Sequence, residues 1–170
     1  MSTEHPASTN ASNEPIPGSL PEADQARLRH LLETQKYAVL ATDNHGQPYT
    51  SLMAYSITED LRAFILMTER GRLKYENLMS NPRVAIMIDN RENLGSDLNA
   101  TLAVTSLGVA EEISSAERDA ARAFCLARHP ALQSFAESSN CAFIRIQVTS
   151  YVIVQQFQDV IEWRLSAPPA

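Results

Sequence analysis

The chain has 170 residues, of which 44% are hydrophobic and 20% charged, and its formal net charge is −6. A chain of this size can bury the core of one domain, and its acidic balance disfavours nucleic acid as a partner. No apolar run approaches the roughly 20 residues that cross a bilayer, and the sequence does not open on a basic region followed by an apolar one. We therefore expect a soluble, cytoplasmic protein that binds neither membranes nor nucleic acids.

The composition changes along the chain. Residues 1–19 are rich in Ser, Thr, Asn, Pro and Glu and predict a disordered tail, followed by one domain at residues 20–165 and a short C-terminal tail at 166–170. Cys125 and Cys141 lack CxxC spacing, and the four histidines share no ligand spacing. We expect two core thiols and no metal site built by the protein.

The first elements are marked by apolar spacing and by turn signals. Leu28, Leu31 and Leu32 recur at helical spacing and predict a helix from Pro21 to about Lys36. The turn signal at residues 43–46 separates apolar segments at 37–42 and 48–57, which predicts two antiparallel strands. A third strand at 61–68 and a short helix ending near residue 81, before a proline, complete the first half.

The second half continues with strands at 84–89 and 98–112, in which Gly108 is a candidate bulge position. Ser114 and Ser115 predict the cap of a helix that begins at residue 116 and ends near 128. A short helical piece around 132–136 and strands at 141–149 and 151–164 follow. Strands joined by short turns predict a mainly β fold with flanking helices, an antiparallel Greek-key barrel instead of a parallel Rossmann sheet.

A basic cluster stands out in this acidic chain. Arg70, Arg72 and Lys74 occupy alternate positions at the N-terminus of the predicted short helix. Cations are unfavourable at a helix N-terminus, whereas free backbone N–H groups and positive side chains together suit a phosphate. The alternative is a solvated turn whose cations contact only water. The helix that follows the cluster favours the phosphate site.

The order of these motifs resembles the FMN-binding split-barrel proteins related to pyridoxamine 5'-phosphate oxidase. The resemblance covers roughly residues 22–163 and is carried by the segments 46–51 (GQPYTS), 68–74 (TERGRLK), 77–78 (NL) and 81–84 (NPRV). It implies a split barrel that forms a twofold homodimer, with FMN in clefts between the subunits. In this interpretation Trp163, the one tryptophan, closes the partner's cleft or plugs the interface.

The resemblance also implies which residues contact the cofactor. Residues of the second strand would approach the flavin ring and ribityl chain, and the basic loop would bind the phosphate. Asn90 and its neighbours form a second polar patch, where Arg91 either approaches the cofactor or pairs with Asp89 or Glu92. The candidate cofactor-binding residues are Thr50, Ser51, Leu52, Met67, Thr68, Arg70, Arg72, Leu73, Lys74 and Arg91.

The second half is also similar to the haem-utilisation branch of the same group, on the segments 127–130 (ARHP), 141–145 (CAFIR) and 151–157 (YVIVQQF). That branch has glycines where Gln155 and Gln156 stand here. His129 is the axial-ligand candidate if haem binds, although a histidine that ends a helix before proline has an ordinary structural role.

These residues lead to several functional hypotheses. The first is an FMN-dependent oxidoreductase that positions the flavin near a small molecule, and its catalytic residues are unknown, because Tyr49, Tyr55 and His45 show no partner in the sequence. The second is a non-catalytic protein that binds flavin or haem. A third is a relative that uses a deazaflavin.

Overall fold

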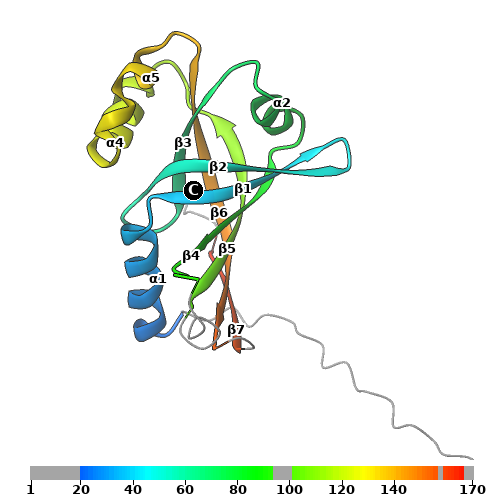
Figure 1. Ribbon diagram of the computed structural model, residues 1–170, viewed down its shortest axis with the longest axis vertical. Helices are drawn as coiled ribbons and strands as arrows, with labels where there is room; N and C mark the ends of the chain where they lie inside the picture. Colours follow the sequence, from blue (N-terminus) through cyan, green and yellow to red (C-terminus); the bar gives the residue numbers. More distant parts are fainter. Residues whose placement is uncertain (1–19, 94–100, 157–158, 167–170) are drawn as a thin grey trace, which may run out of the picture.

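The computed structural model describes residues 20–93, 101–156 and 159–166 (Figure 1). Its strands form one antiparallel sheet in the order β3-β2-β1-β4-β5-β6-β7, and an additional pairing of β3 with β6 closes six of them into a barrel. The prediction of a mainly β antiparallel barrel with flanking helices is confirmed. The predicted tail at 1–19 and residues 167–170 of the predicted C-terminal tail lie outside the described residues.

The elements follow one another in the order that the sequence predicts. The helices are α1 (Glu22–Thr34), α2 (Leu73–Ser80), α4 (Arg118–Arg128), the short 3-10 helix η1 (Pro130–Leu132) and α5 (Gln133–Glu137). The strands are β1 (Tyr37–Asn44), β2 (Gln47–Ile57), β3 (Ala63–Glu69), β4 (Arg83–Asp89), β5 (Ala103–Glu112), β6 (Cys141–Gln155) and β7 (Asp159–Arg164). In this part of the chain no helix is both long and apolar enough to cross a membrane.

Strands β1 and β2 form a hairpin whose far end projects from the barrel (Figure 1). Asn44 pairs with Gln47, which leaves His45 and Gly46 as a two-residue loop with φ values of 52° and 89°. Positive φ at both loop positions is the type I′ geometry that matches the twist of antiparallel strands, and glycine suits it. The predicted turn is therefore confirmed.

Two apolar clusters hold the domain together, and β3 contributes to both. Phe64 and Leu66 point into the barrel, where they pack with the buried leucines of α1. Ile65 and Met67, on the other face of β3, pack with residues of α4, α5 and β6 in a smaller cluster. Because both of its faces are covered, β3 reads as a continuous apolar run instead of an alternating one.

The smaller cluster contains both cysteines. Cys125 and Cys141 are buried and form no disulfide, which confirms the prediction of core thiols. Burial raises the pKa of the Cys125 thiol to about 12, and it also raises the pKa of Cys141. Neither thiol is activated as a nucleophile.

Two details of the second half differ from the sequence prediction. The predicted strands at 141–149 and 151–164 are one continuous strand, β6, that ends before Gln156, followed by β7. Ser150 does not interrupt the strand, because it is buried and paired with residues of β5 and β7. The predicted strand at 98–112 begins only at Ala103, and residues 98–100 lie outside the described residues.

The predicted serine cap of the next helix is wrong. Helix α4 begins at Arg118 with Glu117 as its N-cap, and no side chain caps it. The Ser114 hydroxyl donates instead to the Glu117 carboxylate at 2.9 Å. A hydroxyl engaged with a carboxylate is not available to the backbone N–H groups of the helix.

Gly108 lies at an irregularity in the pairing of β5 with β6, as the sequence predicts. Leu107 is opposite Ser150 and Gly108 is opposite Val148, so Thr149 is an extra residue. A Cβ atom on Gly108 would lie 2.6 Å from the Gln147 carbonyl oxygen and 2.8 Å from Ile146 Cγ2. Only glycine fits this close approach of two strands without displacing the backbone.

We therefore expect Gly108→Ala to lower the free energy of unfolding by about 1 to 3 kcal/mol, the usual cost of forcing extra volume into a packed site. Urea unfolding followed by circular dichroism measures this loss. Thr105→Val, a shape-conserving change at a half-buried position of the same strand, should stay within about 0.5 kcal/mol of the parent. Equal stability of Gly108→Ala and the parent would contradict the packing argument.

Candidate functional site

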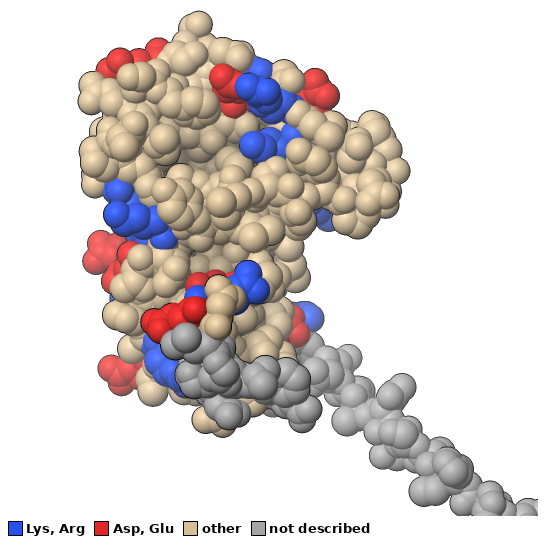
Figure 2. Space-filling model, in the orientation of Figure 1, with Lys and Arg blue, Asp and Glu red and all other residues tan. Residues whose placement is uncertain are grey.

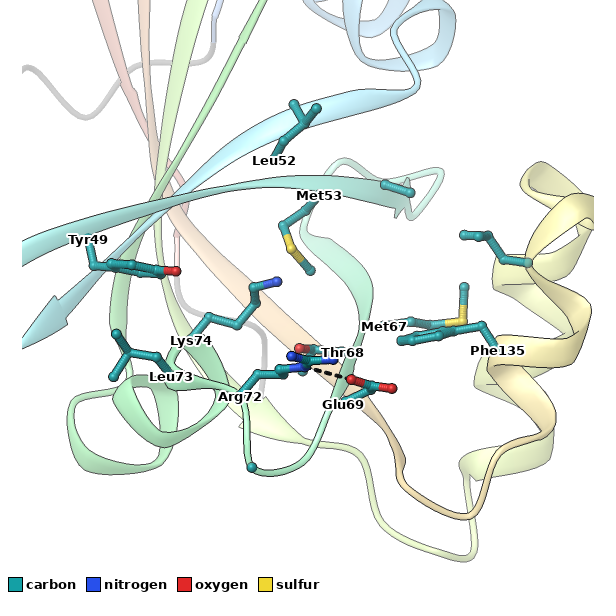
Figure 3. Close-up of a pocket in the computed structure, with 13 residues that line it drawn as sticks. Tyr49, Leu52, Met53, Met67, Thr68, Glu69, Arg72, Leu73, Lys74 and Phe135 are labelled. Atoms are coloured by element: carbon teal, nitrogen blue, oxygen red, sulfur yellow. Dashed lines mark hydrogen bonds and ion pairs between the residues drawn. The ribbon is translucent and has the colours of Figure 1, made fainter.

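A pocket of about 750 Å³ lies between the basic loop and α5, over β2 and β3 (Figure 3). Three parts of the chain line it: β2, the segment from the end of β3 through the basic loop to the first residues of α2, and the η1–α5 segment. The lining residues are Tyr49, Leu52, Met53, Ala54, Met67, Thr68, Glu69, Gly71, Arg72, Leu73, Lys74, Leu132 and Phe135.

The basic loop joins β3 to α2 and forms one end of the pocket. Gly71 has a φ of +79°, a left-handed conformation that allows the chain to turn sharply after β3. Helix α2 begins at Leu73, and no side chain caps its N-terminus. The first backbone N–H groups of a helix have no acceptor within the helix. The predicted arrangement of cations at a helix N-terminus is confirmed.

Two polar groups at this end have no partner among the residues that the structure describes. Thr68 is 3% exposed, and its hydroxyl oxygen has no hydrogen-bond partner in the structure. Lys74 is half-buried, and no carboxylate in the described ranges pairs with its ammonium group. A buried hydroxyl without a partner costs free energy, so a residue of this kind that lines a pocket points to a ligand.

Arg72 lies at the same end but shares its charge with an acidic neighbour. Its Nε donates to Glu69 Oε2 at 2.6 Å, and both side chains line the pocket (Figure 3). Figure 2 shows the same proximity on the surface: Lys and Arg atoms gather around a hollow near α2, with Asp and Glu atoms directly beside them. This end of the pocket therefore contains one carboxylate as well as two cations.

Arg70 points away from the pocket. It forms an ion pair with Glu112 at the end of β5 and donates to the backbone oxygens of Ser139 at 3.0 Å and Cys141 at 3.4 Å. The hydroxyl of Tyr75 donates to the same Glu112 carboxylate at 2.6 Å. Arg70 thus ties the basic loop to the neighbouring strands and does not line the pocket.

The environment of Glu112 fits this tying role. Burial alone raises the pKa of its carboxyl, but hydrogen bonds from Tyr75 and Arg70, together with the nearby positive charges, outweigh burial, so the pKa lies below its ordinary value. The hydrogen bond to Glu112 and burial raise the pKa of Tyr75. Glu112 therefore stays ionised at neutral pH and holds both partners.

Of the three residues that the sequence suggests on β2, the structure places only Leu52 in the pocket lining. Thr50 and Ser51 do not line the pocket. Leu52 borders it with a side chain that is 71% exposed and points away from Met53, whereas Met53 points into the pocket (Figure 3). Because side chains alternate along a strand, Ser51 and Met53 share the face opposite to Leu52, and Met53 is buried.

Arg91 lies elsewhere. It follows β4, its Nε is 3.2 Å from Asp89 Oδ1, and it is not among the lining residues. This is the surface pairing that the sequence offered as the alternative to cofactor contact. The structure thus brings together Leu52, Met67, Thr68, Arg72, Leu73 and Lys74, and leaves Thr50, Ser51, Arg70 and Arg91 outside the lining. Binding of a cofactor by these residues remains a prediction.

Sequence reasoning missed the apolar wall contributed by the second half of the chain. Leu132 and Phe135 line the pocket opposite α2, and Phe135 lies beside Met67 (Figure 3). The sequence predicted the short helix that carries them but gave no signal that it packs near the basic loop. That proximity comes from the pairing of β3 with β6, which is a long-range contact.

The three proton-transfer candidates are placed very differently. Tyr49 lines the pocket with its side chain 38% exposed. Tyr55 is buried and donates to the Leu32 carbonyl oxygen at 2.9 Å, and burial raises its pKa to about 12, despite the nearby charge of Arg128. His45 is exposed at the tip of the β1–β2 hairpin. Of the three, Tyr49 alone borders the pocket.

His129, the axial-ligand candidate, lies outside the pocket. It is 8% exposed, and its Nε2 is 2.6 Å from the Tyr55 carbonyl oxygen. The neighbouring Arg128 donates to the backbone oxygens of Leu32, Glu33 and Gln35 at the C-terminus of α1. The two residues join the end of α4 to α1 and β2, which is a structural role.

Comparison with known proteins identifies the family to which the chain belongs. Residues 25–152 match the family described as Pyridoxamine 5'-phosphate oxidase. A pyridoxamine 5'-phosphate oxidase homologue of Schizosaccharomyces pombe is 32% identical over a segment that covers 44% of this chain and 46% of that protein. The chain therefore spans about half the length of this curated relative.

Two solved structures share the fold. A haem-binding protein from Mycobacterium smegmatis is 25% identical, with a TM-score of 0.71, and the match covers 80% of this chain and 55% of that one. A FAD-binding protein from Mesorhizobium loti is 19% identical, with a TM-score of 0.60, and the match covers 74% of this chain and 90% of that one. The sequence match over most of the domain, together with the split barrel, shows that this chain belongs to the pyridoxamine 5'-phosphate oxidase family.

Proposed function

We propose that the chain is an FMN-binding oxidoreductase of the pyridoxamine 5'-phosphate oxidase-like group that acts on a small molecule by hydride or electron transfer at the flavin. The observation that carries this proposal is the division of one pocket into two chemically different ends. Thr68, Arg72 and Lys74 form a polar end, and Met53 and Phe135 belong to an apolar end. A flavin mononucleotide needs both.

The polar end fits a phosphate monoester. Lys74 and the first backbone N–H groups of α2 supply donors that have no competing partner within the described part of the chain, and the Thr68 hydroxyl, also unpaired there, supplies a further hydrogen-bonding group. Hydrogen bonds to an ionised phosphate are shorter and stronger than those between neutral groups. These residues would hold the phosphate, and the Thr68 hydroxyl would then have a hydrogen-bond partner.

The apolar end fits a flat ring system. Met53, Met67 and Phe135 face the pocket from three elements (Figure 3). Thioether and aromatic groups adapt well to an aromatic ligand. When bound, a flavin supplies the hydride or electron chemistry itself, so the protein's task is to bind and orient the ring and to keep water from it. Tyr49 is the pocket residue best suited to donate a hydrogen bond to a substrate.

Binding of haem by a non-catalytic protein is the second candidate, because the Mycobacterium smegmatis structure at 25% identity is that of a haem-binding protein. The position of His129 does not support haem ligation by this residue, since its Nε2 already contacts the Tyr55 carbonyl oxygen.

The absorption spectrum of the purified protein separates the candidates. A flavin gives a yellow protein whose pigment is released on denaturation, whereas haem gives a Soret band, and a deazaflavin is distinguished by its fluorescence.

We further propose that a second copy of the chain covers the outer face of the barrel next to the pocket. Leu52 pairs across the strands with Val39, and Val39 pairs with Met87, so their side chains share one face of the sheet. Leu52 is 71% and Met87 38% exposed, which leaves an apolar band in water. Leu52 also borders the pocket, so a partner on this band would complete the pocket wall.

If this band is the dimer interface, Met87→Glu should make the protein monomeric, because an unpaired carboxylate would be buried against an apolar partner surface. Size-exclusion chromatography with light scattering measures the mass. Phe124→Glu, an equivalent change on α4 at a residue outside the band that is 39% exposed, should leave the mass unchanged. A parent protein that is itself monomeric, or a Met87→Glu variant that remains a dimer, would refute this interface.

The phosphate assignment predicts the behaviour of a double variant. Replacing Arg72 and Lys74 by Ala should weaken FMN binding about 100-fold or more, because each charged hydrogen bond to phosphate contributes roughly 1.5 to 3 kcal/mol. Riboflavin, which lacks the phosphate, should bind with nearly unchanged affinity. Fluorescence titration of the apoprotein with each flavin measures both dissociation constants.

A matched control removes the same charge elsewhere. Lys36 and Arg83 are exposed and do not line the pocket, so their double Ala variant should bind FMN as the parent does. If FMN binds the Arg72 and Lys74 variant as tightly as the parent, the phosphate does not lie at this loop.

A further inference from the structure

Glu69 is an unexpected residue for a phosphate site. It is the last residue of β3, its side chain lines the pocket, and its Oε2 accepts the hydrogen bond from Arg72 Nε at 2.6 Å. In Figure 3 the two side chains meet directly below Thr68. The carboxylate therefore makes with Arg72 the contact that a phosphate oxygen would make.

The net positive charge at the polar end of the pocket is smaller than the three cations in the sequence suggest. Arg70 is paired with Glu112 and points away, and Arg72 is paired with Glu69. Lys74 is the one pocket-lining cation without a carboxylate partner among the residues that the structure describes. With Glu69 ionised, Arg72, Lys74 and Glu69 together present a net charge of about +1 to a ligand, whereas a phosphate monoester carries nearly two negative charges at neutral pH.

We propose that Glu69 is a specificity-determining residue that weakens the binding of dianionic phosphate at this pocket. This inference rests on the proposed function, because it concerns the same phosphate site. Glu69 competes with the phosphate for Arg72 and repels it, so a phosphorylated flavin is held less tightly than the cations alone would hold it. The outcome is a cofactor that exchanges more easily.

The opposite role would be that Glu69 orients Arg72 for the ligand. The Arg72 side chain is 67% exposed and Glu69 35% exposed, and a pair so accessible to water restrains a side chain only weakly. The repulsion between the Glu69 carboxylate and a phosphate dianion a few ångströms away is larger than this restraint. The dianion carries two charges, and a bound ligand excludes water from between the groups. Repulsion therefore outweighs orientation.

The test compares Glu69→Gln with the parent by fluorescence titration of the full-length apoprotein with FMN and with riboflavin. The glutamine still accepts a hydrogen bond from Arg72 but carries no charge. We expect the dissociation constant for FMN to fall about tenfold, while that for riboflavin stays within about twofold. Glu69→Ala should change FMN binding in the same direction, since the loss of charge is what matters.

Glu76→Gln is the matched control, because Glu76 is exposed in the first turn of α2 and does not line the pocket. It should leave the preference for FMN over riboflavin unchanged within about twofold. Equal tightening by Glu76→Gln would show a general charge effect and overturn the specific role of Glu69.

The outcomes also separate this inference from the proposed function. If the parent prefers FMN and the Arg72 and Lys74 double variant loses that preference, but Glu69→Gln binds FMN no more tightly, then the inference about Glu69 is wrong and the phosphate site stands. If the parent binds riboflavin as tightly as FMN and the double variant changes nothing, the phosphate site itself is wrong, and the role of Glu69 is refuted with it.

Discussion

The pairing of β3 with β6 is the constraint on which the rest of the structure depends. It closes the barrel, and its register places Met67 opposite Phe143 and Glu69 opposite Cys141. The loop after β3 therefore meets the segment before β6, where the backbone N–H of Arg70 donates to the Asn140 carbonyl oxygen at 3.0 Å. Both walls of the pocket follow from this one pairing, since the loop carries the cations and the segment before β6 carries Phe135.

The three cations of the basic loop and the first turn of α2 have three different environments. Arg70 is bound to Glu112 and fixes the loop, Arg72 is shared with Glu69, and Lys74 faces the pocket without a carboxylate partner in the described ranges. The backbone conformation between Arg70 and Arg72 explains why their side chains point in different directions. Gly71, with its positive φ, reverses the chain between them, so neighbouring arginines leave on opposite sides. A charge count from sequence treats these residues alike, whereas the fold does not.

Much of the fold could be predicted from the sequence, because its signals are local. The leucine spacing of α1, the turn at His45 and Gly46, the proline after α2 and the glycine at position 108 each act within a few residues. The errors arose where tertiary contacts decide. Ser150 stays within β6 because both neighbouring strands pair with it, and Ser114 does not cap α4 because Glu117 takes its hydroxyl.

The site could be predicted in part for the same reason. Met67 to Lys74 are contiguous and lie around one turn, so the basic end of the pocket is visible in the sequence. The contributions of Leu132 and Phe135 depend on strand pairing over more than 60 residues of chain, which no local pattern reveals. On β2 the sequence points to Thr50, Ser51 and Leu52, but it does not show that Met53 and Tyr49 line the cavity and that Thr50 and Ser51 do not.

The double burial of β3 means that the two ends of the pocket rest on different apolar clusters. The cationic end follows a strand anchored in the large barrel cluster, whereas the η1–α5 wall belongs to a smaller cluster of eight buried residues. Local opening is easier where fewer apolar contacts must be broken. We therefore expect the helical wall to open locally more easily than the barrel, so amide protons of α4 and α5 should exchange with solvent faster than those of the barrel strands.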